Sequence, residues 1–181
     1  MTKVKSFFMT TASAEKLNKI TALVLLIGAI LVFIGLVIMN FLFLHFKSTF
    51  QVFNNYNVPI INFIFNDFYI IVSLFLFFVV FAVLLVPGLL KRITLAYYLF
   101  FVFNGLLIIA NLLFIWFGKL FNADVLYIAD IINYMPEETE RLLFTLNCSY
   151  FFQGVILSLV HGWLIWRYAQ IDVKRLFKIK D

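Results

Sequence analysis

Long stretches without a charged residue alternate with short polar segments along this chain of 181 residues. Four such apolar stretches run from about Ile20 to Phe46, Phe68 to Leu90, Ile93 to Gly118 and Leu142 to Trp166. A helix rises about 1.5 Å per residue, so roughly 20 apolar residues cross a hydrocarbon core of about 30 Å. A helix also satisfies its own backbone hydrogen bonds in lipid. The pattern predicts an all-α polytopic membrane protein with four transmembrane helices in an antiparallel bundle.

Composition supports one membrane domain over residues 1–181, with basic tails at 1–19 and 167–181. Hydrophobic residues make up 65% of the chain, whereas soluble domains contain about 45–50%. The single cysteine, Cys148, excludes an internal disulfide and a thiolate metal site. His45 and His161 have no second histidine or carboxylate at metal-ligand spacing, so we expect no metal and no cofactor.

The distribution of basic residues predicts the orientation of the chain. Eleven of the 14 Lys and Arg residues lie in the two tails and in the short Lys91–Arg92 connection. The positive-inside rule therefore places both termini in the cytoplasm. The net charge of +5 is thus a topology signal and not evidence for nucleic acid. We expect the basic tails to meet anionic lipid headgroups, in a bilayer that is most simply a bacterial inner membrane.

The connections and the tail carry amphipathic segments that predict short interfacial helices. Pro59 follows a turn signal in the first outer connection, among aromatic residues. The tail after Trp166 mixes apolar and basic residues. In the third connection, apolar residues recur at helical spacing, namely Phe121, Val125, Ile128, Ile132 and Met135.

Small residues predict where helices approach one another, because association in lipid depends on close contact between helices. Gly154, Ser158 and Gly162 recur every four residues in the fourth stretch. Gly28 and Gly35 are seven apart in the first stretch, and Ala22 and Ala29 follow a neighbouring line. The second stretch is nearly all large and apolar, which predicts the most lipid-facing helix or a contact with another protein.

Polar side chains in the third and fourth stretches predict an intramembrane polar face. Depth counting from the outer ends places Asn111 level with Tyr150 and Asn104 level with Ser158, with Gln153 between. Buried amides need partners, so these residues should bond across the helices. His161 lies near the inner end and is read as an interface residue or a hydrogen-bond donor. The face is either an adhesive between helices or the lining for a small neutral or lipidic solute.

The absence of recognisable chemistry shapes the functional hypotheses. No Asp, Glu, Lys or Arg falls within the four stretches, which disfavours ion-coupled transport. The leading hypothesis is a non-catalytic accessory or assembly subunit that binds lipids and another membrane protein or a second copy. The alternative is a passive carrier or channel lined by Asn104, Asn111, Gln153 and Ser158. A third hypothesis is a lipid-modifying enzyme that uses an outer acidic cluster of Asp124, Asp130 and Glu137.

Overall fold

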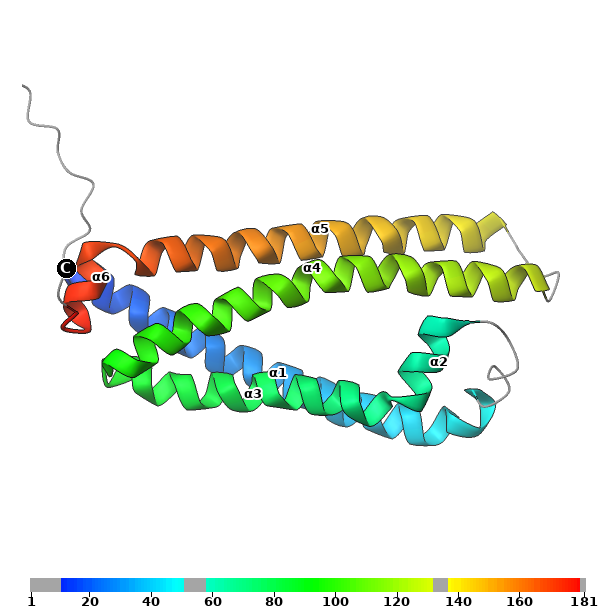
Figure 1. Cartoon of the computed structure of the whole chain (residues 1–181), viewed down its shortest axis with the longest axis horizontal. Helices are drawn as coiled ribbons and strands as arrows, with labels where there is room; N and C mark the ends of the chain where they lie inside the picture. The colour runs from blue at the N-terminus through cyan, green and yellow to red at the C-terminus, as the bar shows by residue number, and fades with distance from the viewer. Residues whose placement is uncertain (1–10, 51–57, 132–136, 180–181) are drawn as a thin grey trace, which may run out of the picture.

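The computed structural model describes residues 11–50, 58–131 and 137–179, and every element in these ranges is a helix. The four long helices are α1 (Thr11–Phe50), α3 (Phe68–Leu90), α4 (Thr94–Ile131) and α5 (Glu137–Tyr168) (Figure 1). Two short helices, α2 (Pro59–Asn66) and α6 (Ile171–Leu176), lie in the first connection and in the C-terminal tail. Each long helix is long and apolar enough to cross a membrane, which confirms the predicted fold class of an integral membrane protein.

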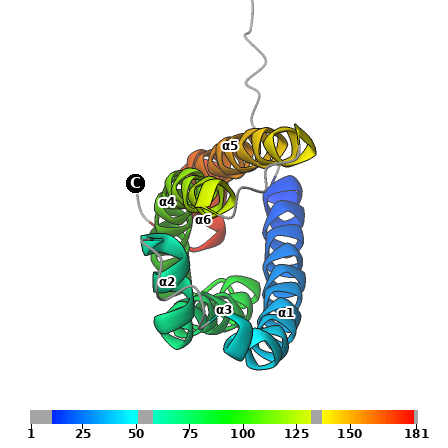
Figure 2. The same cartoon turned by 90° about the vertical axis from the view of Figure 1, so that its right-hand side faces the viewer.

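The long helices form two antiparallel pairs, α1 with α3 and α4 with α5. The pairs meet where α3 turns into α4 and where α6 packs on α1, and they diverge toward the opposite end (Figures 1 and 2). The end where they meet is named the basic end, and the opposite end, where α2 runs between α3 and α4, is named the α2 end. Among the described residues, the basic end carries six exposed cationic residues, Lys16, Lys19, Lys91, Arg92, Arg175 and Lys178.

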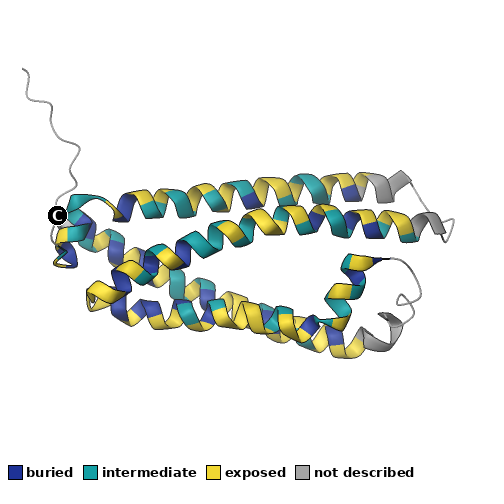
Figure 3. Cartoon of the chain, viewed as in Figure 1, coloured by how far each residue is buried: buried dark blue, intermediate teal, exposed yellow. Residues whose placement is uncertain are grey.

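Exposed side chains run along all four long helices, and most of them are large and apolar (Figure 3). Leu31 of α1, Leu84 of α3 and Phe144 of α5 are examples, each more than 60% exposed. In water a continuous apolar surface of this kind is an aggregation hazard. Hydrocarbon accepts it without cost, so the surface agrees with a membrane location.

A lane of buried residues spaced seven apart joins α1 to α3, formed by Ala22, Ala29, Leu36 and Phe43. The alanines allow close approach near the basic end. Toward the α2 end, the ring of Phe43 stacks on Phe68 with centroids 3.9 Å apart. Leu36 and Phe43 therefore replace the alanines toward the α2 end, where larger side chains fill the space between α1 and α3.

The glycines of α1 lie beside this lane and not in it. The sequence predicts Gly28 and Gly35 as packing residues, yet a Cβ added to either meets no atom within 4 Å. Consecutive residues in a helix are rotated by about 100°, so a helix that presents its alanine lane to α3 turns the neighbouring glycines away. Both glycines are therefore left open on the surface of α1.

The second apolar stretch, now α3, is less lipid-facing than its composition predicts. It has the largest buried share of the four apolar segments in the described chain. The reason is its position between α1 and α4 near the basic end, where Leu85 and Leu89 are almost fully buried. Aromatic edges make the contact with α4, since the rings of Phe81 and Phe103 lie 5.2 Å apart at 76°.

The turn between α3 and α4 is a Schellman motif with an arginine at the left-handed position. The Ile93 N–H donates to the Gly88 carbonyl at 2.9 Å, and the Arg92 N–H donates to the Leu89 carbonyl at 3.1 Å. Arg92 has a φ of 58°, a region that favours glycine. Gly88 itself allows close approach, because an added Cβ would lie 2.6 Å from the Ala96 Cβ. The turn thus fixes α3 and α4 as a hairpin.

At the other end, α4 continues through Ile131 without the separate short helix that the spacing from Phe121 predicts. Residues 119–131 contain no glycine or proline to interrupt the helix. Ile132 and Met135 lie outside the described residues. The extension matters because it carries Asp124, which is buried against α2.

Asp124 caps the N-terminus of α2 from a different helix. One carboxylate oxygen accepts hydrogen bonds from the Ile60 N–H at 2.7 Å and from the Ile61 N–H at 2.9 Å. Both donors belong to the first turn of α2, where backbone N–H groups have no partner within the helix. Val58, the N-cap residue of α2, makes no side-chain capping bond. Asp124 therefore takes the place of a local cap and ties α2 to α4.

Replacing Asp124 with alanine should release α2 from α4. The change leaves two N–H groups of a buried turn without an acceptor, so we expect a loss of about 1–2 kcal/mol in the free energy of unfolding. Thermal unfolding in detergent, with amide hydrogen exchange at Ile60 and Ile61, measures the effect. Asp67→Ala is the matched control, because Asp67 stands at the N-cap of α3 and makes no side-chain capping bond. Equal losses in the two variants would contradict the capping role of Asp124.

Candidate functional site

The interface between α4 and α5 repeats every seven residues along α4. Tyr97, Asn104, Asn111 and Gly118 follow one face of α4, as their spacing predicts. The hydroxyl of Tyr97 donates to the Tyr168 carbonyl at 3.1 Å, and Asn104 bonds His161. An added Cβ on Gly154 would meet Ile115 and the Asn111 carbonyl, and one on Gly118 would meet the Tyr150 ring. These contacts define a layered antiparallel seam that runs the length of both helices.

The centre of this seam is a hydrogen-bonded pair between an asparagine and a histidine. Asn104 is fully buried, and its Nδ2 donates to the Phe100 carbonyl at 2.8 Å. Its Oδ1 lies 2.9 Å from Nδ1 of His161. An amide oxygen only accepts, so His161 donates from Nδ1. The pair satisfies both polar ends of Asn104 and locks α4 to α5 at one level.

The register of the seam differs by about one turn from the register expected by counting from the outer ends. Asn111 lies against Gly154 instead of level with Tyr150, and Asn104 meets His161 instead of Ser158. The register is set at the basic end, where the Tyr168 and Phe100 rings stack with centroids 4.1 Å apart. Counting residues from the outer connection does not give this register, because the sequence of the connection does not fix where each helix begins and ends.

Several polar atoms in the seam are buried without a hydrogen-bond partner. Gly154 brings the backbones close, so the Nδ2 of Asn111 is covered but unbonded. The same holds for the Oγ of Ser158, the Oδ1 of Asn147 and the Oδ1 of Asn122, whose Nδ2 donates to the Leu143 carbonyl at 3.3 Å. Unpaired buried polar groups cost free energy, so a row of them in one interface is a feature that needs a reason.

Two of the residues expected at the polar face or in the packing stripe lie elsewhere. Gln153 is exposed, because it precedes Gly154 and is rotated by about 100° from the seam. Gly162 is half-buried, but an added Cβ there meets no atom within 4 Å. Of the two glycines in the stripe, Gly154 shows the close backbone approach expected of a small-residue contact and Gly162 does not.

A second polar cluster, at the basic end, links all four long helices. Asn18 is only 2% exposed, and its Nδ2 donates to the Leu89 carbonyl of α3 at 2.8 Å. Its Oδ1 accepts from the Tyr168 hydroxyl of α5 at 3.0 Å, and the Tyr168 carbonyl accepts from Tyr97 of α4. Sequence reasoning missed Asn18 because it assigned residues 1–19 to a basic tail. The available signal was its position four residues before Ala22, on the side of α1 that meets the bundle.

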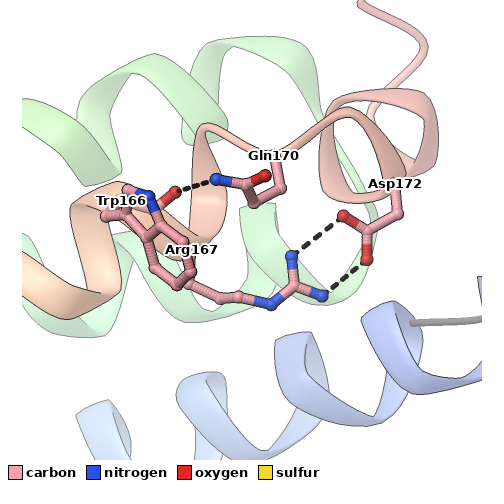
Figure 4. Close-up of polar contacts among 4 residues, drawn as sticks. All are labelled: Trp166, Arg167, Gln170 and Asp172. Atoms are coloured by element: carbon pink, nitrogen blue, oxygen red, sulfur yellow. Dashed lines mark hydrogen bonds and ion pairs between the residues drawn. The ribbon is translucent and has the colours of Figure 1, made fainter. Parts of the chain in front are cut away.

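The basic end is closed by α6, which is held by an ion pair (Figure 4). The Arg167 guanidinium at the end of α5 binds the Asp172 carboxylate in a bidentate fork, with an Nη1–Oδ1 distance of 2.9 Å. Both side chains are largely shielded, with exposures of 9% and 11%. The hydrogen bonds from Arg167 lower the pKa of Asp172 below its ordinary value. Gln170 bridges the turn by donating to the Trp166 carbonyl at 3.3 Å.

The described residues offer little for catalysis. They contain no group of three or more His, Cys, Asp or Glu side chains placed to hold a metal ion. Asp124, the candidate acid of the outer cluster, is occupied by the backbone of α2. The side chains of Asp130 and Glu137 lie outside the described residues. Among the described residues, no set of acidic side chains is therefore placed together as the enzyme hypothesis expects.

Comparison of the chain with protein-family models, with curated proteins and with solved structures finds no match.

The Asn104–His161 pair should contribute measurably to stability. Asn104→Leu leaves the Nδ1–H of His161 without its acceptor in a buried seam, so we expect a loss of about 1–2 kcal/mol. Unfolding of the monomeric, detergent-solubilised protein measures the change. Gln153→Leu is the control, because it makes the same amide-to-leucine change at an exposed position of the same bundle. A loss in the control as large as that in Asn104→Leu would contradict the role of the pair.

Docking of α6 should be sensitive to acid. Because the pKa of Asp172 is lowered in the fold, the ion pair stabilises α6 above the ordinary pKa of a carboxyl and is lost as pH falls through the lowered value. We expect amide exchange at Phe177, whose N–H bonds to Val173 and Lys174, to accelerate in that acid range. Asp172→Asn should show fast exchange at every pH and no acid step. Glu15→Gln, which removes a half-buried carboxylate of α1 that pairs with Lys19 and Arg92, should keep the acid step. Loss of the step in this variant would assign the effect to Glu15.

Proposed function

We propose that this chain is a small, non-catalytic membrane protein that binds a transmembrane helix of another membrane protein, as an accessory or assembly subunit. The observation that carries the proposal is that Gly28 and Gly35 of α1, named the glycine lane, face open space. Gly28 and Gly35 lie seven residues apart on a helix that already packs against α3 by a different lane. The partner helix would occupy the side of α1 that the chain itself leaves uncovered.

The lane has the composition of a helix-binding surface. Glycines allow a second backbone to come close, and close van der Waals packing is one of the forces that hold helices together in lipid. Val24, Leu31 and Met39, on the same side of α1, are all at least 45% exposed and provide apolar walls beside the glycines. Glycine also weakens an α-helix relative to alanine by about 1 kcal/mol, so two unused glycines in one span are a cost without a gain inside this chain.

The charge distribution supports a proposal for the orientation of the protein. We propose that the basic end faces the cytoplasm, because the exposed cations of Lys91, Arg92 and Arg175 gather there. In that orientation these groups lie at the level of anionic headgroups. A bacterial inner membrane supplies such lipids.

Filling the lane should abolish partner binding while leaving the fold intact. In Gly28→Leu/Gly35→Leu the new side chains enter open space, so the chain should fold at least as stably as before. The protein is solubilised gently at native expression level, and the mass and composition of the particle are measured. We expect a stoichiometric unrelated protein with the natural chain and its loss from the double variant.

The matched control is Gly105→Leu, since Gly105 of α4 also has no atom within 4 Å of an added Cβ. It should retain the partner. Recovery of the natural chain without any other protein would contradict the proposal, as would retention of the partner by the double variant or its loss from Gly105→Leu.

A second candidate is a passive carrier for a small neutral or lipidic solute, favoured by the unpaired polar atoms in the α4–α5 seam. The Nδ2 of Asn111 and the Oγ of Ser158 are one donor and one hydroxyl without protein partners. In that case Asn104→Leu should stop flux in a protein that remains folded. If the polar face only holds α4 and α5 together, Asn104→Leu should alter stability alone.

A further inference from the structure

A row of exposed residues on α5 has the spacing of a coiled-coil seam. Successive members are separated by four and three residues in alternation, which is the spacing of the a and d positions of a heptad repeat. Gln153 and Val160 fall at a positions, and the others at d positions. All five members are exposed: Ser149, Gln153, Ile156, Val160 and Trp163. This set is named the Gln153 row.

The Gln153 row is separate from the contact with α4. Gly154 and His161, which face α4, each follow a member of the row by one residue. A step of one residue turns the side chain by about 100°. The row therefore lies on a side of α5 that the described chain leaves uncovered.

Gln153 is the reason this side needs a partner. Its position in the apolar segment Leu143–Tyr168 is at least about 15 Å from either end, deep within the hydrocarbon. In the described part of the chain its amide makes no hydrogen bond, and water is absent at that depth. An amide in hydrocarbon without a partner costs several kcal/mol, more than the apolar contacts of one side chain return.

A second copy of the chain supplies the partner that the amide lacks. A carboxamide both donates and accepts, so two of them satisfy each other. Copies of one chain insert with one orientation, so a two-fold axis along the membrane normal brings the two Gln153 side chains to the same depth. A polar residue at a single a position is also the feature that fixes register and two-strand pairing in parallel coiled coils.

We propose that two copies of this protein associate through the Gln153 row, as a parallel pair of α5 helices joined by the Gln153 amides. The row lies on a different helix from the glycine lane, so the dimer goes beyond the proposed function and does not depend on it. The dimer would present two glycine lanes, one from each copy.

Disulfide cross-linking in native membranes tests the geometry. Cys148 is first replaced by alanine, and single cysteines are then introduced as Val160→Cys within the row and Leu159→Cys outside it. Leu159 is the more exposed of the two, at 68% against 46%, so accessibility alone favours the control. We expect an oxidised dimer from Val160→Cys and at least about five-fold less from Leu159→Cys, since residues at a positions face each other across the axis.

The role of the amide is tested by dilution of labelled protein in liposomes, with energy transfer between copies as the readout. Gln153→Leu should weaken the dimer roughly 3- to 30-fold, because an interhelical hydrogen bond in a membrane contributes about 0.6–2 kcal/mol and leucine gains nothing from leaving lipid. Gln153→Asn keeps both donor and acceptor and should retain most of the affinity. Both changes are at an exposed position, and unchanged thermal unfolding shows that each variant is folded.

Two results would overturn the dimer. One is cross-linking of Leu159→Cys as strongly as Val160→Cys, and the other is a chain that stays monomeric at every protein-to-lipid ratio. An unrelated protein that cross-links to Val160→Cys in place of a second copy would assign the row to that protein and also overturn it. Each of these leaves the glycine-lane experiment unaffected, so the two proposals fail separately.

Discussion

The buried hydrogen bonds of Asn18 are the constraint on which the rest of this structure depends. Apolar contact gives helices in lipid no hydrophobic reason to associate, so polar bonds and close fit decide which helices stay together. One asparagine accepts from the hydroxyl of Tyr168 and donates to a carbonyl of α3, and Tyr97 completes the cluster from α4. The four long helices are joined at this level, and the stacking of Phe100 on Tyr168 sets the register of the whole α4–α5 seam from the same point.

Away from that cluster the bundle is two pairs of helices and not a closed core. Beyond the cluster, each pair has its own contacts: the lane from Ala22 to Phe43 between α1 and α3, and the polar layers between α4 and α5. Toward the α2 end, among the described residues, α2 is what joins the pairs, through Asp124 and through Phe63, whose ring stacks near Phe117. The divergence explains why the surfaces of α1 and α5 remain uncovered, and both functional proposals concern those surfaces.

The sequence predicted the coarse fold because hydrocarbon imposes a strong rule: a span must be long, apolar and helical. The polar line of α4 was also readable, since seven residues return a helix to nearly the same face. The choice between neighbouring lines was not readable. The spacing of Gly28 and Gly35 is as regular as that of Ala22 and Ala29. Only the structure shows that the alanines, and not the glycines, face α3. The capping role of Asp124 and the bond from Asn18 to α3 were not readable, because the partner in each is a backbone group, which has the same chemistry at every position.

Two helix ends near the basic end have a feature that natural sequences usually avoid. Arg92 and Lys178 occupy the left-handed position of Schellman motifs, with φ values of 58° and 56°, where glycine is the unstrained residue. A side chain there costs about 1–2 kcal/mol. Glycine would end each helix as well, yet it would remove a cation from the flank of a span. During insertion the cations beside the spans decide which loops are translocated. At these two positions the chain accepts backbone strain and keeps a cation beside a span, and in the finished fold the cation of Arg92 binds Glu15 of α1 at 2.7 Å.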